Sequence, residues 1–313
     1  MSHPAATTFS LTAPRAAALV ALSAAGFGAM AIFARHAYAD GVDVHGVLMP
    51  RFVIAAAVLW MALRLLGQRL PERRRLPGLA LMGLGYVGQS FCFFTALRYI
   101  PAGMVALLLY LYPLFVVLLS WLVGQEPLTR RKLLALVVCS VGTVLTLGLG
   151  DIGQVTLDWR GVALAVAAAV IYSVYIVGGS RVTRGLDPMA STTVILASAA
   201  GALVLIVLAR AALGEPTRFA HTVAGWSAVL AIALVSTVLA VGLFVVGLKH
   251  LGASRTALIS TLEPVITVGL AAVFLSERLA GLQLVGGALV LAGALLLALA
   301  PAEEARDART GSA

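Results

Sequence analysis

One carboxylate inside a long apolar stretch offers the clearest chemistry in this chain. Glu263 lies about 15 Å along a helix that would begin near Ala253, at ~1.5 Å per residue, which is close to the middle of a bilayer. Thr256, Ser260 and Thr267 share its helical face, so this polar stripe would face the interior of a bundle. A charge at that depth is costly and marks a functional site by default. Three roles remain open for it: proton coupling, binding of a substrate amine, or a structural hydrogen bond.

Two prolines stand inside apolar spans and would break them. Pro264 lacks the N–H that would bond to the carbonyl of Ser260, and Pro113 does the same to Leu109. We therefore expect a helix kink at each proline. Each kink either belongs to a transport pathway or is a structural bend only.

A cation inside another span could complement the carboxylate. Arg51 follows Pro50 within the span 44–63, roughly 10 Å from the outer end of that span. Its guanidinium could snorkel to the membrane interface. Alternatively, it could be the counter-charge for an anionic group of a substrate, or for Glu263.

Aromatic and amide side chains on further spans could line the same space, with simple packing as the alternative. Tyr110 is predicted to point to a different face from Tyr112. No catalytic or metal-binding motif is present, and no cofactor is expected. The predicted substrate-binding residues are Arg51, Tyr86, Gln89, Tyr112, Tyr172, Ser260 and Glu263, with Pro113 and Pro264 as the kinks.

The composition requires a bilayer as solvent. Of 313 residues, 61% are hydrophobic and 11% charged, with a mean hydropathy of +1.03. Soluble domains carry about 25% charged residues. The net charge of +9 does not indicate nucleic-acid binding, because the basic residues cluster in short loops between apolar runs. Cys92 and Cys139 lie inside apolar runs and are expected to be small core residues.

The elements that position these residues are ten apolar spans joined by short loops, which predicts an all-α integral membrane protein. If the N-terminus is cytoplasmic, fifteen Lys and Arg residues fall in inside loops and six in outside loops. This asymmetry predicts that both termini are cytoplasmic. The spans are approximately 16–34, 44–63, 76–97, 102–123, 133–150, 161–180, 188–209, 224–248, 253–275 and 281–300.

The ten spans fall into two copies of five. At an offset of 151 residues, Pro113 matches Pro264, Glu126 matches Glu277, and Gly142 matches Gly293, whereas Tyr112 stands where the second copy has Glu263. Five spans per copy is an odd number, so the second copy must be inverted in the membrane. Inverted repeats are typical of secondary transporters whose substrate site lies at the repeat interface.

The ordered set of proline, terminal glutamate and glycine-rich last helix resembles the EamA domains of the drug/metabolite transporter superfamily. The matching segments are LYLYPLFVVLLSWLVGQEPLT (109–129) and STLEPVITVGLAAVFLSERLAG (260–281), together with Arg51-Phe52. The first copy departs slightly, because Gln125 separates Gly124 from Glu126. The resemblance divides the chain into a first EamA repeat at 16–150 and a second at 161–300. The segment 301–313 is polar and is expected to be a disordered cytoplasmic tail.

The resemblance implies a multi-pass carrier of the bacterial inner membrane. Its first four and its sixth to ninth helices would form a central cavity, and its fifth and tenth would be peripheral. The predicted function is secondary transport, with export of small metabolites such as amino acids, by alternating access and with proton coupling open. A non-transporting scaffold or an intramembrane enzyme is the alternative. The expected partners are a small-molecule substrate and the lipid bilayer, without nucleic acid; small residues on the fifth and tenth spans leave a homodimer open.

Overall fold

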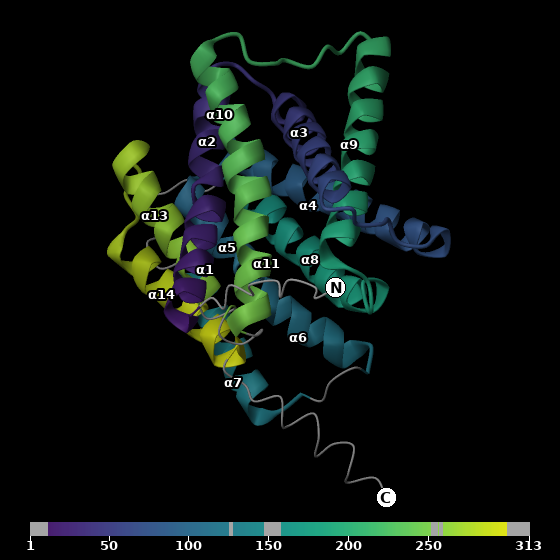
Figure 1. The fold of residues 1–313 in the computed structure, drawn as a ribbon. Coiled ribbons are helices and arrows are strands. Elements are labelled where there is room, and N and C mark those ends of the chain that lie inside the picture. Colours follow the sequence, from purple (N-terminus) through teal and green to yellow (C-terminus); the bar gives the residue numbers. More distant parts are fainter. Residues whose placement is uncertain (1–11, 125–127, 147–157, 252–255, 257–258, 299–313) are drawn as a thin grey trace, which may run out of the picture.

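The computed structural model describes residues 12–124, 128–146, 158–251, 256 and 259–298, and every regular element in these ranges is helical (Figure 1). The all-α class is therefore confirmed. The predicted tail at 301–313 and Glu126 lie outside the described residues. The elements are α1 (Ala13–Gly28), α2 (Met30–Ala39), α3 (Val44–Leu65), η1 (Arg73–Arg75), α4 (Leu76–Ala96), α5 (Ala102–Leu109), α6 (Tyr112–Leu122), α7 (Arg130–Thr146), α8 (Trp159–Val182), α9 (Pro188–Ala212), α10 (Val223–Ala233), η2 (Leu234–Leu239), α11 (Ala240–Leu251), α13 (Leu262–Phe274) and α14 (Gly281–Ala298).

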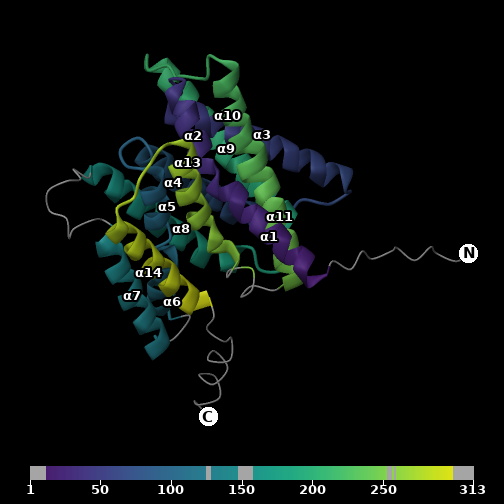
Figure 2. The same cartoon turned by 90° about the vertical axis from the view of Figure 1, so that its left-hand side faces the viewer.

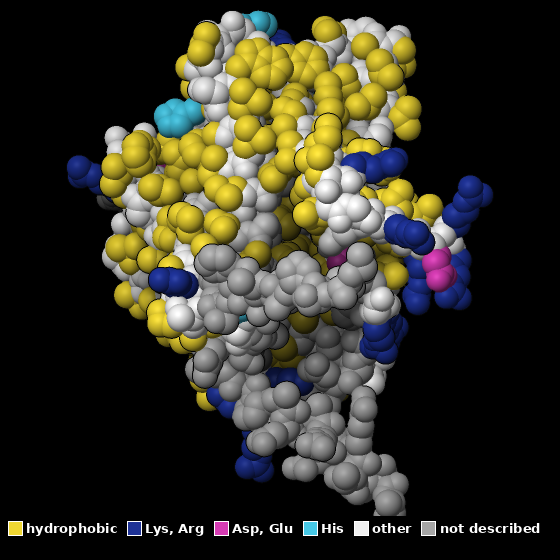
Figure 3. All heavy atoms as spheres, in the orientation of Figure 1, with side chains coloured by type: hydrophobic (Ala, Val, Ile, Leu, Met, Phe, Trp, Pro, Cys, Tyr) yellow, Lys and Arg dark blue, Asp and Glu magenta, His cyan; other side chains and the backbone are white. Residues whose placement is uncertain are grey.

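Seven helical runs in the described part of the chain are long and apolar enough to cross a bilayer. Hydrophobic side chains cover most of the described surface seen in Figure 3. An apolar exterior of this kind requires lipid around it, so the chain is a multi-pass membrane protein. The seven runs are Ala13–Ala39, Val44–Leu65, Arg73–Ala96, Ala102–Leu122, Trp159–Gly179, Pro188–Ala212 and Val223–Gly247; Leu262–Phe274 and Gly281–Leu296 are shorter apolar helices.

Three of the seven runs are interrupted. The first breaks at Ala29, between α1 and α2, and the fourth breaks at Tyr110 and Leu111, between α5 and α6. The seventh contains the six-residue π-helix η2 between α10 and α11. The break before α6 agrees with the kink predicted from Pro113, which stands in the first turn of that helix. The breaks at Ala29 and in η2 carry no proline, and the sequence analysis did not predict them.

The loop between α9 and α10 is fastened to the turn between α2 and α3 by two aspartates. Asp43 accepts hydrogen bonds from the backbone N–H of Gly46 (2.7 Å) and of Arg218 (3.1 Å). Asp40 accepts from the hydroxyl of Thr222 at 2.7 Å and from the backbone N–H of His221 at 2.9 Å. These segments lie together at one end of the molecule (Figure 1).

Helices α7 and α14 pack against each other through small residues, and Figure 2 shows them side by side. A Cβ on Gly142 would lie 2.7 Å from the backbone oxygen of Gly286, and one on Gly293 would lie 2.4 Å from Sγ of Cys139. Backbones can approach this closely only where side chains are absent. The small residues of the fifth and tenth predicted spans therefore make a contact within one chain.

The α7–α14 contact predicts a sharp difference between two glycine-to-alanine variants. Gly142→Ala should destabilise the protein by about 1–3 kcal/mol, because its methyl group must push the backbone of α14 away. Gly201→Ala in α9 is the matched control, since no atom lies within 4 Å of the added Cβ. Thermal unfolding in detergent would measure both. Equal melting temperatures for the two variants would contradict the packing.

A second prediction concerns the loop anchored by Asp40. The Thr222 hydroxyl, followed by the His221 backbone N–H, holds the pKa of Asp40 below its ordinary range. A carboxylate with a lowered pKa in the folded state stabilises above its unfolded pKa of about 3.9 and loses that effect as the pH falls through its folded pKa. Protection of the His221 and Thr222 amides against hydrogen exchange should therefore fall below about pH 4.

Asp40→Asn should show the same reduced protection already at neutral pH. Asp158→Asn is the control, because Asp158 caps the start of its own helix through the N–H of Arg160. If both variants keep the neutral-pH amide protection of the native chain, Asp40 does not hold the loop between α9 and α10 in place.

Candidate functional site

Arg51 is a buried cation at the centre of an aromatic cage. Its side chain lies in α3 and the residue is only 2% exposed. Its Nε donates to Thr237 Oγ1 at 3.0 Å, and its Nη2 donates to the hydroxyl of Tyr86 at 3.1 Å. The guanidinium carbon lies 5.0, 5.3 and 5.6 Å from the ring centroids of Phe52, Phe94 and Tyr86, respectively, which are cation–π distances. This burial excludes the alternative in which Arg51 snorkels to the interface.

No carboxylate pairs with Arg51 in the part of the chain that the structure describes. Ion pairs between described residues include Arg35–Glu277, Arg74–Glu72 and Arg210–Glu215. A buried charge without a counter-ion is costly. The remaining N–H donors of a guanidinium suit a planar anion such as a carboxylate.

A continuous wall of tyrosines runs from Arg51 toward Glu263. The centroid of the Tyr86 ring lies 5.9 Å from that of Tyr175, which stacks on Tyr172 at 6.1 Å. Tyr172 meets Tyr112 edge-on at 4.9 Å, and Tyr112 meets Tyr110 at 5.7 Å. Helices α4, α8 and α6 supply most of these rings. We call this set of five residues the tyrosine wall.

Glu263 lies at the far end of the tyrosine wall, in the first turn of α13. The Tyr110 hydroxyl donates to the carbonyl of Ser260 at 2.5 Å and lies 3.4 Å from Oε2 of Glu263. The sequence predicted that Pro264 leaves the carbonyl of Ser260 without its helical N–H donor. In the structure the Tyr110 hydroxyl donates to that carbonyl instead. Tyr110 thus covers the break in the helix and touches the carboxylate at the same time.

The break between α1 and α2 meets the start of α13. The Thr267 hydroxyl lies 3.0 Å from the carbonyl oxygen of Gly28 and 3.0 Å from that of Glu263. A Cβ on Gly28 would lie 2.9 Å from the carbonyl oxygen of Glu263. The two irregular backbones are therefore in direct contact beside the carboxylate.

The structure brings most of the predicted site residues onto one connected set. Arg51, Tyr86, Tyr172, Tyr112 and Glu263 are linked through the tyrosine wall. The other two differ. Gln89 is buried, and its hydrogen bond is with the neighbouring Ser90 at 3.4 Å. The hydroxyl of Ser260 turns back to the carbonyl of Thr256 at 2.9 Å, so only its backbone faces Tyr110.

The placement predicted for Tyr110 was wrong. A straight helix would separate Tyr110 from Tyr112 by about 200°. The interruption at Tyr110 and Leu111 ends that phase relation, and the two rings come into contact. A helical wheel drawn through a proline break therefore misassigns the face.

The sequence analysis missed Thr237, Phe52 and Phe94. Thr237 lies in η2, is 1% exposed and also donates to the carbonyl of Ile232 at 2.9 Å. A signal for it was present: Ser236 and Thr237 are the only hydroxyl pair inside the apolar run 228–248. Phe52 was noted only as part of the Arg51-Phe52 match, without a role at the site, and nothing in the sequence marked Phe94, because aromatic residues in apolar helices are usually packing.

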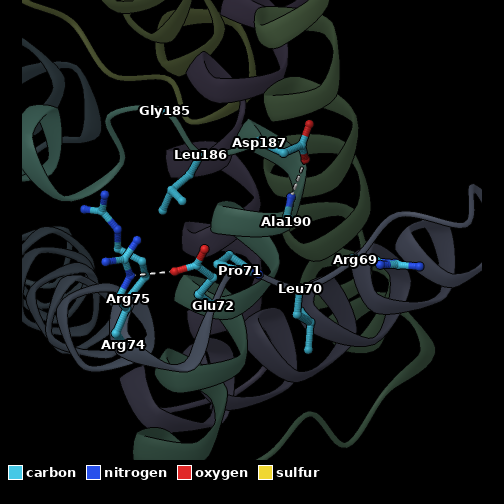
Figure 4. A pocket seen from close by; sticks show the side chains of 10 residues that line it. All are labelled: Arg69, Leu70, Pro71, Glu72, Arg74, Arg75, Gly185, Leu186, Asp187 and Ala190. Carbon is cyan, nitrogen blue, oxygen red and sulfur yellow. Dashed lines mark hydrogen bonds and ion pairs between the residues drawn. The ribbon is translucent and has the colours of Figure 1, made fainter.

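A basic pocket of about 340 Å³ opens between the loop after α3 and the start of α9 (Figure 4). Arg69, Arg74 and Arg75 line it together with Glu72 and Asp187. Glu72 pairs with Arg74, and Asp187 accepts from the N–H of Ala190 at 2.8 Å, so both acids are engaged. This pocket is separate from the tyrosine wall.

Comparisons with known proteins point to transport. The model of the EamA-like transporter family matches residues 14–148 and again residues 159–299. The threonine/homoserine exporter RhtA of Escherichia coli is 27% identical over 256 residues, covering 80% of this chain and 81% of that protein. The uncharacterized transporter YcbK of Bacillus subtilis is 25% identical over 269 residues, covering 83% and 85% of the two chains. A solved crystal structure matches with a TM-score of 0.65 at 25% identity, covering 91% of this chain and 98% of that one.

The hydrogen bond from Tyr110 to Ser260 can be tested by a double-mutant cycle with Pro264. Tyr110→Phe should cost about 1–3 kcal/mol, because it leaves a buried carbonyl without its donor. In a Pro264→Ala background, the restored N–H can bond that carbonyl, so the same change should cost clearly less.

Thermal unfolding of the four proteins in detergent measures the coupling. Tyr175→Phe is the control, because the Tyr175 hydroxyl has no hydrogen-bond partner in the described ranges. Costs for Tyr110→Phe that are equal in both backgrounds would show that its hydroxyl does not serve the break.

Proposed function

The chain belongs to the EamA-like transporter family, and on that premise we propose that it is a secondary transporter that exports small metabolites such as amino acids by alternating access. Curated relatives over most of its length are named as transporters, and one is named as a threonine/homoserine exporter. The observation that carries the proposal is the buried guanidinium of Arg51, which faces aromatic rings and has no carboxylate partner among the described residues.

The proposed architecture is ten membrane helices in two inverted repeats, 16–150 and 161–300, with both termini in the cytoplasm of a bacterial cell and the protein in its inner membrane. The contact between α7 and α14 supports the repeat. Gly142 approaches Gly286 and Val290, while Gly293 approaches Ala135 and Cys139. At the offset of 151 residues, Gly142 corresponds to Gly293, Ala135 to Gly286, and Cys139 to Val290. The two sets of contacts are therefore equivalent, which is the reciprocity expected across a pseudo-twofold axis.

The proposed substrate is zwitterionic. Arg51 would bind its carboxylate when the solute lies at one end of the tyrosine wall, and Glu263 would bind its amine when the solute lies at the other end. The two charged residues do not form an ion pair with each other in the structure, so neither neutralises the other. Both stand where backbone irregularity meets the helix bundle, as substrate sites of transporters with broken helices do.

Proton coupling is the alternative role for Glu263. The Tyr110 hydroxyl has one proton, which it donates to the carbonyl of Ser260. Its contact with Glu263 is then a hydrogen bond only when the carboxyl group carries a proton to donate. An ionised Glu263 would instead compete with the carbonyl for the tyrosine proton. The protonation state of Glu263 would in this way change the hydrogen bond that the Ser260 carbonyl receives at the break before α13.

Transport assays with two variants separate these roles. Native protein in proteoliposomes should move threonine or another amino acid of a tested panel, and Arg51→Gln should lose at least about tenfold in apparent affinity for any carboxylate-bearing substrate. If Glu263 couples protons, Glu263→Gln should lose gradient-driven transport and keep pH-insensitive exchange. If it binds the amine, exchange is lost as well.

Arg160→Gln is the control for both variants, because Arg160 is exposed at the start of α8 and lies away from the tyrosine wall. Unchanged transport in Glu263→Gln would return Glu263 to a structural role. A native protein that moves no solute of the panel under any gradient would favour a non-transporting scaffold.

A further inference from the structure

A cavity distinct from the pocket beside Arg74 lies at the end of the molecule where α2, α3, α4 and α9 meet, and neither Glu263 nor the tyrosine wall lines it. Its volume is about 670 Å³, within the range of small-molecule sites. The side chains of Arg98, Arg210 and Arg218 line it, together with His45, Phe91 and Thr95. Figure 1 shows α2, α3 and α9 in the upper part of the view and α4 nearer its middle.

The walls of this cavity are held in place by hydrogen bonds. The backbone N–H of Asp43 donates to the carbonyl of Arg218 at 3.1 Å, and the backbone N–H of Arg218 donates back to the Asp43 carboxylate at 3.1 Å. A Cβ on Gly46 would lie 2.1 Å from the carbonyl oxygen of Arg218, so only glycine permits this approach. The cavity is therefore bounded by an ordered loop.

The charges around the cavity leave an excess of unpaired cations. Both oxygens of Asp43 accept from backbone N–H groups, and Glu215 pairs with Arg210 at 3.2 Å. Neither Arg98 nor Arg218 has a carboxylate partner in the described part of the chain. An anion entering the cavity would meet two free guanidinium groups.

Two polar atoms at the cavity are buried without any hydrogen-bond partner: Oγ1 of Thr95 and Nε of Arg210. Both residues line the cavity. Buried donors are almost always satisfied, so a group missing from the protein itself is expected at this place. Both atoms can donate to an oxygen anion.

The position of these arginines adds a separate argument. In the proposed orientation they lie on the outer face, where basic residues are disfavoured because they oppose the orientation of the chain. Three of the six outer arginines nevertheless line this one cavity. The smaller pocket beside Arg74 lies at the opposite, cytoplasmic face and needs no such explanation.

We infer that this cavity is a binding site for the carboxylate or phosphate group of an anion, held by Arg98 and Arg218 with Thr95 and Arg210 as further donors. The inference does not rest on transport. The anion is either a small soluble carboxylate or phosphate, or the phosphate of a lipid headgroup, and the same donors serve both.

The test uses the full-length protein in nanodiscs of phosphatidylcholine, with citrate and inorganic phosphate as probes in calorimetric titrations. We expect saturable binding that weakens with ionic strength. The double variant Arg98→Gln/Arg218→Gln should bind at least about tenfold more weakly, and Arg160→Gln should bind like the native chain. If the native chain shows no saturable binding, or if Arg160→Gln loses as much affinity as the double variant, the proposed anion site is wrong.

Thr95→Val separates a built site from surface charge, because it keeps the net charge and removes only the unpartnered hydroxyl. It should weaken binding several-fold without lowering the melting temperature of the empty protein, since no protein hydrogen bond is lost. Native affinity in this variant would overturn the proposed donor set.

The source of the anion is decided by repeating the titration in nanodiscs that contain phosphatidylglycerol. If a lipid headgroup occupies the cavity, citrate binding by the native chain should weaken, and phosphorus analysis should find lipid retained by the native chain but not by the double variant. If the ligand is soluble, citrate binding should be the same in both lipids. Either result supports the anion site.

Discussion

A peptide group that loses its helical partner inside a membrane must find another within the protein, because lipid offers none. This constraint explains the role of three hydroxyl groups that lie beside irregular backbone. Tyr110 covers the carbonyl of Ser260 that Pro264 leaves free, and Thr267 reaches the carbonyl of Gly28 at the end of α1. Ser23 donates to the carbonyl of Ala240, next to the π-helix η2, at 2.7 Å. At these three places a hydroxyl side chain accompanies a break or irregularity in a helix.

The same low dielectric that makes these bonds necessary also gives the charged residues their importance. Arg51 is surrounded by aromatic rings whose faces attract a cation, and Thr237 and Tyr86 accept two of its N–H groups. That environment tolerates a guanidinium without neutralising it. The tyrosine wall then connects this cation to the only carboxylate among the predicted site residues.

The two segments that match the family model differ where the polar groups lie and are similar where helices pack. The reciprocal approach of Gly142 and Gly293 keeps α7 and α14 in close contact. Glu277 also joins the halves, because its carboxylate accepts from the N–H groups of Ala102 and Gly103 at 3.0 and 3.2 Å, at the start of α5. At the centre, Tyr112 stands in one half and Glu263 in the other, which makes an asymmetric surface from similar frameworks.

The amino-acid sequence by itself determined the helical class, the seven apolar runs of the described residues that are long enough to cross a bilayer, the repeat of proline and glycine, and the residues that are costly inside a membrane. These properties depend on composition and on spacing along one chain, which a helix of known rise converts directly into depth and face. The kink at Pro113 and the free carbonyl of Ser260 followed from the missing N–H of proline alone.

Only the tertiary structure decided which side chains form hydrogen bonds with the free carbonyl and contact the buried charged residues. Tyr110 turned toward Glu263 because the break at Tyr110 and Leu111 removes the helical phase on which its predicted face depended. Thr237 accepts a hydrogen bond from Arg51 because the π-helix η2 shifts the helical register between α10 and α11. No proline marks that shift in the sequence. Contacts between residues 150 or more positions apart arise from packing between helices, and the physical reason that sequence reasoning could not reach them is that their geometry depends on several helices at once.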